Sequence, residues 1–163
     1  MNRVCKKEVL EKIIAALTAD LALFTRAAQT AHAAATHAEC LPDNKYDTTA
    51  LEASYVAQGQ ANRAQDIRRA LESYRNLELR PFGDADPLRL TALITIEAED
   101  SSCRHFFLGP AAGGLKLMVE AEECIVITPE STLGRALLGK YCGDELQIGS
   151  GAARKTFLII AVS

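Results

Sequence analysis

The sequence predicts an α+β protein in which an antiparallel helical hairpin, a coiled coil, precedes a small, mainly antiparallel β-domain with one short helix. The first half of the chain carries apolar residues at helical spacing on both sides of a turn-forming segment. The second half carries short strand-like runs separated by Gly, Pro and acidic turns. We expect the hairpin over residues 1–77, a linker over 78–87 and the β-domain over 88–163.

The first helix has an apolar residue every three or four positions, as in a coiled-coil seam. Large side chains begin this seam and alanines end it, so the partner helix is expected to approach more closely near the bend. The seam consists of Leu10, Ile14, Leu17, Leu21, Phe24, Ala28, Ala31, Ala35 and Ala38. A dimer in which these seams pair between two chains stays open from the pattern alone.

The bend is predicted at LPDN, because Pro42 disfavours a helical backbone at Leu41. Either Thr48 or Thr49 is expected to cap the second helix, with Glu52 completing a capping box for Thr49. The returning seam consists of Ala53, Ala57, Ala64, Ile67, Leu71 and Tyr74. Each arm would contain about 30 residues and be about 45 Å long.

Beyond the linker ELRPFGDADP, six runs rich in Ile, Val, Leu and Phe are expected to form strands. They are RLTALITIEAED, CRHFFLG, LKLMVE, ECIVITP, DELQIG and KTFLIIAVS. Between the fourth and fifth runs, STLGRALLGK predicts a short helix that starts near Ser131 and closes at Gly139.

Net charge, apolar runs and cysteine spacing argue against several classes of partner and site. The net charge of -3 predicts no bulk attraction to nucleic acid or to anionic membranes. No apolar run approaches the length of a membrane span, so we expect a cytoplasmic protein without a membrane partner. The five cysteines lack CxxC spacing, which favours reduced thiols over a disulfide framework or a zinc site.

Enzyme signatures are missing from the sequence. The glycines of GPAAGG (109–114) fit neither nucleotide fingerprint, so a hairpin loop is expected there. No serine stands in a GxSxG context, and no Cys/His pair can be read from the order of residues. We therefore expect no enzymatic activity from the chain by itself.

Acidic residues surround the bend. Asp47 and Glu52 are explained by the positive end of the second helix dipole. Glu39 and Asp43 precede that helix, and their carboxylates could serve as oxygen ligands of Mg²⁺. Two carboxylates do not make a complete metal site, but they could complete one that belongs to another protein.

Arginines are in excess on the second arm, which carries Arg63, Arg68, Arg69 and Arg75. A solvated helix face explains such an excess. The same arginines could instead steady a phosphate backbone.

Two segments resemble the bacterial Gre transcript-cleavage factors. ITPESTLGRALLGKYCGDELQI (127–148) is similar to the family's signature, which ends in an SPxxRAxxGKxxGD pattern. DNKYDTTALEASYVAQGQANRAQDI (43–67) is similar to the acidic-tip segment, in which an ENAEY-like run precedes the second helix of a coiled coil. The motifs follow in the family's order, and the resemblance covers nearly the whole chain.

The resemblance implies a transcription elongation factor that binds bacterial RNA polymerase as a monomer. An FKBP-like C-terminal domain would dock at the mouth of the secondary channel through Glu130, Ser131, Thr132 and Arg135. The coiled coil would reach the active site and meet the transcript 3′ end and the nucleic acid of the elongation complex, DNA included, with Arg63, Arg68 and Arg69 as contacts to RNA or polymerase. The tip residues Glu39, Cys40, Asp43, Asn44 and Tyr46 would act there, and Asp43 and Glu39 would share the polymerase's Mg²⁺.

Two departures from the family pattern leave two functions open. The family's tip reads GDLxEN, whereas this chain has ECLPDN, so Cys40 stands at the position of the first acid and Asp43 at that of the second. Mg²⁺ prefers hard oxygen over a thiol. Thr132 also stands where the family has Pro. The chain would either stimulate cleavage of backtracked transcripts or occupy the channel and inhibit or compete with cleavage factors.

An FKBP-like fold also raises peptidyl-prolyl isomerase activity as an alternative. That activity needs an aromatic-lined apolar pocket. Phe106, Phe107, Tyr141 and Phe157 are instead interpreted as strand and core residues.

Overall fold

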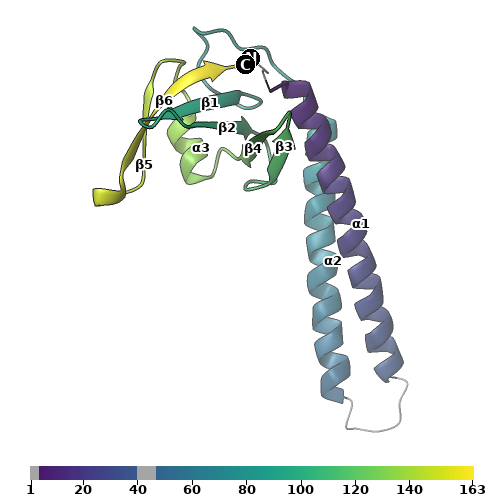
Figure 1. Ribbon diagram of the computed structural model, residues 1–163. Helices are drawn as coiled ribbons and strands as arrows, with labels where there is room; N and C mark the ends of the chain where they lie inside the picture. The colour runs from purple at the N-terminus through teal and green to yellow at the C-terminus, as the bar shows by residue number, and fades with distance from the viewer. Residues whose placement is uncertain (1–3, 40–46) are drawn as a thin grey trace. The chain divides into compact units, whose positions relative to one another are not determined.

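The computed structural model describes residues 4–39 and 47–163. The chain forms two compact units: Ala15–Glu72 is one, and Met1–Ile14 together with Ser73–Ser163 is the other. Helices α1 (Lys6–Glu39) and α2 (Asp47–Arg75) form the predicted hairpin (Figure 1). The boundaries predicted at 77 and 88 mark where the spacing of apolar residues changes from helical to strand-like. The division into compact units is different, because it places the first turns of α1 with the sheet.

The predicted seam is confirmed most clearly on α2. On α1, Leu21, Phe24, Ala28 and Ala31 are half-buried, and the side chain of Ala38 is outside the described ones. Buried members include Leu17 and Ala35 on α1 and Ala57, Ala64 and Ile67 on α2. With 34 and 29 residues, the helices are about 51 and 44 Å long.

The seam is wrong at its start. Leu10 and Ile14 are only half-buried, whereas Val9 and Ile13 are fully buried. These turns belong to the same compact unit as the sheet. Their buried side is therefore chosen by that unit and not by the spacing of the coiled coil.

The predicted cap of the second helix is also wrong. Helix α2 begins at Asp47, so Thr48 and Thr49 already lie inside it. An aspartate in the first turn suits the positive end of the helix dipole. The helix thus begins before the threonines that were expected to cap it.

Six strands form one sheet in the order β3-β4-β2-β1-β6-β5. The strands correspond to the six predicted runs: β1 (Leu93–Ala98), β2 (Cys103–Leu108), β3 (Lys116–Val119), β4 (Glu122–Ile127), β5 (Glu145–Ile148) and β6 (Lys155–Val162). A 3-10 turn, η2 (Gly151–Ala153), leads into β6.

The sheet is mixed, and the expectation of a mainly antiparallel domain is confirmed. The pair β2–β4 is parallel, and the other four pairs are antiparallel. A tight turn reverses β3 into β4, and β4 instead of β3 lies beside β2. Strand β4 therefore runs in the same direction as β2.

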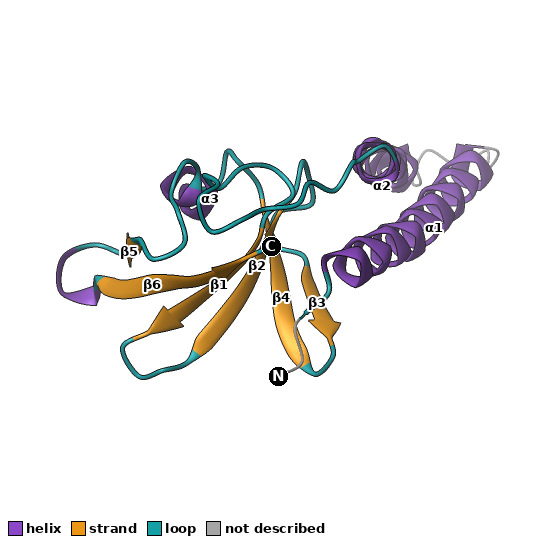
Figure 2. Ribbon diagram, turned by 90° about the horizontal axis from the view of Figure 1, so that it is seen from above, coloured by secondary structure: helices purple, strands orange, loops and turns teal. Residues whose placement is uncertain are grey.

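The short helix α3 (Thr132–Leu137) and the connecting loops lie on one side of β1 and β6 (Figure 2). The core on this side contains Ile94, Ile96, Phe106, Leu137 and Ile159, all buried. The opposite face is buried only toward β2 and β4. There the register sets Leu93, Phe107 and Val126 side by side.

The linker 78–87 makes polar contacts with the β-domain, within itself and with the start of α1. The backbone N–H of Arg80 donates to Thr91 Oγ1 at 3.1 Å, and that of Gly83 donates to Asp86 Oδ2 at 2.8 Å. Lys6 Nζ donates to the Arg80 carbonyl at 2.6 Å and lies 4.6 Å from the centre of the Phe82 ring. Burial lowers the pKa of Lys6 to about 8, although the carbonyl and the ring both favour the ammonium.

None of the helices in the described parts of the chain has both the length and the apolar character of a membrane span. Cys5, Cys103, Cys124 and Cys142 are free thiols, and Cys40 lies outside the described residues.

Candidate functional site

The signature-like segment 127–148 leaves the sheet at the end of β4 and returns to it at β5. Ser131 caps α3, because its Oγ accepts from the Gly134 N–H at 2.9 Å and donates to the Thr128 carbonyl at 2.7 Å. The predicted helix start is confirmed. The predicted close is confirmed as well, since Gly139 follows the helix with φ 78°.

Gly134 is needed for this arrangement. A Cβ at that position would overlap the carbonyl oxygen of Thr128, the same oxygen that accepts from Ser131. Helix α3 therefore packs against the chain that precedes it more closely than any other residue would permit.

The predicted docking residues lie around the start of α3. Glu130, Thr132 and Arg135 are exposed, and Ser131 is half-buried because it makes the cap. Thr132 is the first residue of the helix, the position at which Pro is favoured because the missing N–H would have no helical partner. Thr132, where the Gre signature has Pro, therefore leaves the helix start intact.

Tyr141, interpreted from the sequence as a core residue, is 44% exposed, so that interpretation is wrong. It follows α3 in the turn before β5, where its N–H donates to Asp144 Oδ2 at 2.8 Å. Leu138, at the end of α3, is 38% exposed. The exposed side of this segment thus combines charged, hydroxyl and apolar groups.

The arginines predicted to contact RNA or polymerase lie in the compact unit Ala15–Glu72. Arg63 is placed over the Phe24 ring, 5.9 Å from its centre. Arg69 forms an exposed ion pair with Asp66 at 3.9 Å. Arg68 is exposed. A contact with phosphate would compete with the Asp66 pair, which is weak because both partners are solvated.

The tip residues Cys40, Asp43, Asn44 and Tyr46 lie outside the described residues, as does the side chain of Glu39, the last residue of α1. Elsewhere, over 4–39 and 47–163, no group of three His, Cys, Asp or Glu side chains could hold a metal ion. Ser54, Ala57 and Ala61 of α2 line a groove of about 450 Å³ with Ala28 and His32 of α1.

The GPAAGG segment forms a loop that packs against Tyr74, near the end of α2. Tyr74 is fully buried against Gly109, and its hydroxyl donates to the Ala111 carbonyl at 2.6 Å. Burial raises the pKa of Tyr74 well above its usual range. The glycine at 109 is therefore explained by a side chain of this protein and not by a phosphate.

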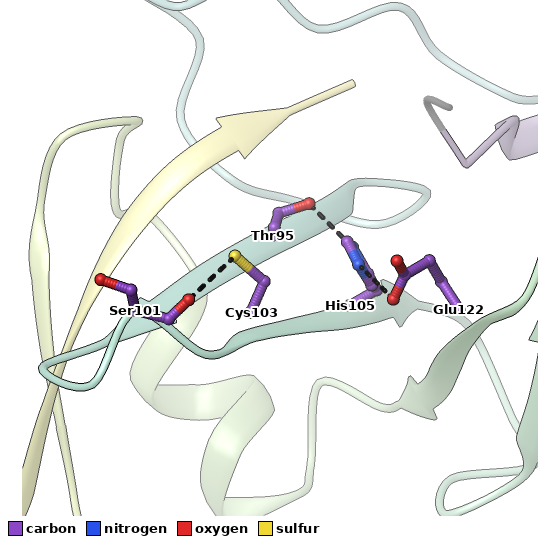
Figure 3. Close-up of polar contacts among 5 residues, drawn as sticks. All are labelled: Thr95, Ser101, Cys103, His105 and Glu122. Atoms are coloured by element: carbon purple, nitrogen blue, oxygen red, sulfur yellow. Dashed lines mark hydrogen bonds and ion pairs between the residues drawn. The ribbon is translucent and has the colours of Figure 1, made fainter. Parts of the chain in front are cut away.

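Sequence reasoning missed a polar cluster on the sheet (Figure 3). His105 Nδ1 lies 3.0 Å from Thr95 Oγ1, and its Nε2 lies 3.7 Å from Glu122 Oε2. Cys103, two residues before His105, instead approaches the Ser101 carbonyl at 4.0 Å. The thiol and the imidazole are thus directed to different partners and do not form a nucleophile–base pair. These residues come from three strands, so their order in the sequence gave no sign of the cluster.

Apart from Tyr141, the aromatic residues considered for an isomerase pocket lie in the core. Phe106, Phe107 and Phe157 are buried, which confirms the interpretation for these three.

No protein-family model and no curated protein matches the chain. Among solved structures, a structure of the transcription factor Gfh1 is similar, with 17% identity, a TM-score of 0.40 and coverage of 93% of both chains. Thermus aquaticus Gfh1 is 18% identical at a TM-score of 0.40, with 90% of each chain covered. The elongation factor GreA/GreB from Nitrosomonas europaea is 18% identical at a TM-score of 0.35, covering 72% of this chain and 93% of that chain. At these values the likeness carries no function over to this chain.

Proposed function

We propose that this chain is a transcription elongation factor of the Gre type. It binds bacterial RNA polymerase and inserts its helical hairpin into the secondary channel. The resemblance of 127–148 to the Gre signature carries this function, because that segment forms a capped helix with exposed charged groups. The second motif, 43–67, leads into α2, as it does in the family's coiled coil.

The β-domain docks in this proposal. Glu130 and Arg135 offer opposite charges on the exposed side of α3, and Leu138 and Tyr141 offer apolar area beside them. The Ser131 cap and the close packing at Gly134 hold the backbone of this segment in one conformation. The segment therefore loses little conformational entropy when the polymerase binds.

The tip then acts in the active site of the polymerase. Mg²⁺ would activate water and stabilise the leaving oxygen when bound there. Among the tip residues, the carboxylates of Asp43 and Glu39 offer the hard oxygens that Mg²⁺ requires, whereas the Cys40 thiol does not. Two carboxylates fit a metal shared with the polymerase and do not fit a site of the chain's own.

A second candidate is a factor that occupies the channel without supporting cleavage. Cys40 favours it, because the residue replaces one of the two acids in the family's tip. Such a factor would dock in the same way and would compete with cleavage factors.

A backtracked elongation complex with labelled RNA tests these functions. If the chain stimulates cleavage, RNA is shortened with Mg²⁺, and Asp43→Ala abolishes the effect. Asp47→Ala, a matched change of an acid assigned to the helix dipole, should retain it. If the chain only occupies the channel, no RNA is shortened, a known cleavage factor is inhibited, and Cys40→Asp gains cleavage.

Docking is tested separately by competition for the polymerase. Arg135→Ala should weaken competition, whereas Arg154→Ala, a matched exposed arginine in another loop, should not. A chain that neither cleaves nor competes is not a factor of this type.

A further inference from the structure

The sheet carries an exposed apolar strip on the side opposite α3. Leu158 of β6 lies directly opposite Glu97 of β1 on one side and Glu145 of β5 on the other. Ile160 follows in the irregular register of β6, two residues along on the same strand. Leu158 is 41% exposed and Ile160 38%. We call the surface formed by these four residues the β6 face.

The pattern of β6 indicates that this face is normally covered. The strand reads KTFLIIAV, with Phe157 and Ile159 buried in the core and Leu158 and Ile160 between and beyond them. A strand with one face in water alternates apolar and polar residues, whereas a strand covered on both faces is apolar throughout. Residues 157–162 of β6 have the second pattern, although Leu158 and Ile160 are exposed.

The charge around Leu158 indicates what kind of partner covers it. Glu97 and Glu145 make no ion pair with any described residue. Both line a shallow cleft of about 380 Å³, together with Leu158 and the acidic Glu99. An apolar floor between unpaired carboxylates favours a partner that is both apolar and basic.

The spacing of the carboxylates suits a helix. Glu97 and Glu145 are separated by two strand spacings, about 10 Å between backbones. Residues i and i+7 of a helix are about 10.5 Å apart along its axis, and i+3 and i+4 lie between them on the same face. A helix crossing the strands would thus set two basic residues over the glutamates and an apolar residue over Leu158.

We infer that the β6 face docks an amphipathic helix of a partner protein, with basic residues at i and i+7 and apolar residues at i+3 and i+4. This surface shares no residue with the docking segment 130–135. Leu158 alternates along β6 with the core residues Phe157 and Ile159, and α3 lies on the core side of this strand (Figure 2). The inference does not depend on the proposed function.

The test is titration of the full-length ¹⁵N-labelled protein with a synthetic helix of about 15 residues that has Lys at i and i+7 and Leu at i+3 and i+4. The control peptide has the same composition, with the lysines moved to the opposite helix face. The first peptide should shift amide signals of β1, β5 and β6 and bind at least tenfold more tightly than the control.

Variants then locate the site. Glu97→Lys and Glu145→Lys should each weaken binding about tenfold, and Leu158→Gln should do the same without a change of charge. Glu78→Lys makes the same charge change at an exposed linker position and should bind as the natural chain does. Because Glu145 and Glu78 are exposed, their variants are expected to fold, which the amide spectrum shows directly.

Equal binding of the two peptides, or shifts centred away from β6, would overturn the inference. So would unchanged affinity in Glu145→Lys. Shifts of the same residues by single-stranded RNA but not by either peptide would overturn it in favour of a nucleic-acid surface.

Discussion

The hydroxyl of Tyr74, the buried residue in the last turn of α2, donates to the carbonyl of Ala111 in the loop between β2 and β3. This hydrogen bond joins residues 37 positions apart in the sequence. Both residues belong to the compact unit that contains the sheet, so the bond attaches the last turn of α2 to that unit. The ring is so close to Gly109 that any side chain there must displace it.

Gly109→Ala should therefore lower the free energy of unfolding by about 2–4 kcal/mol, through overpacking against the Tyr74 ring and loss of its hydrogen bond. Urea unfolding of the full chain measures this loss. Gly113→Ala in the same loop is the control, because its added Cβ meets only the Thr128 side chain, at 3.3 Å, and does not reach Tyr74. Equal losses in the two variants would show that the loop, and not Tyr74, sets the cost.

Ser131→Ala should lower the free energy of unfolding by about 1 kcal/mol, because the cap of α3 loses its acceptor. Ser131→Asp retains an acceptor for the Gly134 N–H but loses the donor to Thr128, so its loss should be smaller than that of the alanine variant. Thermal unfolding of the three proteins gives the order. If aspartate costs as much as alanine, the bond to Thr128 is the important one.

Alkaline pH should destabilise the β-domain partly through Cys124. Burial raises the pKa of this thiol from 9.0 to about 12. The unfolded chain therefore releases the proton first, and stability present below pH 9 is lost at up to about 1.4 kcal/mol per pH unit as the pH rises toward 12.

The comparison with Cys124→Val isolates this contribution, because Tyr74 and Lys6 titrate identically in both proteins. Stability measured at pH 8 and pH 11 should fall less in the variant. Parallel curves for the two proteins would mean that the thiol titrates normally in the folded state.

Gly59→Ala should raise the free energy of unfolding by up to about 1 kcal/mol, since glycine is a poor helix former. No heavy atom lies within 4 Å of the position that its Cβ would take, so the methyl group meets no obstacle inside the protein. Chemical unfolding followed by helical circular dichroism is the measurement. A loss of stability would indicate packing of Gly59 that this structure does not contain.

The same variant offers a functional comparison. A more stable Gly59→Ala chain that competes less well for polymerase would show that a partner approaches the helix at this glycine.

The elements of this fold were predictable because each is local. Strand runs such as KTFLIIAV and the Ser131 cap depend on neighbouring residues. The seam from Leu17 onward depends only on helical spacing. Val9 and Ile13 were missed because their burial depends on the unit that contains the sheet. The parallel pairing of β2 with β4 depends on which strand of the β3–β4 hairpin lies inward, which no single segment encodes.

The site divides in the same way. The capped helix at 131–137 could be predicted from Ser131 and Gly139, and so could the exposed charges beside it. Contacts between distant segments could not. They include His105 with Thr95 and Glu122, Tyr74 with the 109–114 loop, and Leu158 between two glutamates.

The position of β6 has a consequence for how the protein is made. Strand β6 is the last strand in the sequence, yet it lies inside the sheet, between β1 and β5. Glu97 of β1 pairs with Leu158 of β6, which is 61 positions later in the chain. During synthesis β1 therefore emerges from the ribosome long before β6, one of its two neighbours in the sheet. The helical hairpin, whose contacts are closer in sequence, is able to form while the β-domain still lacks its last strand.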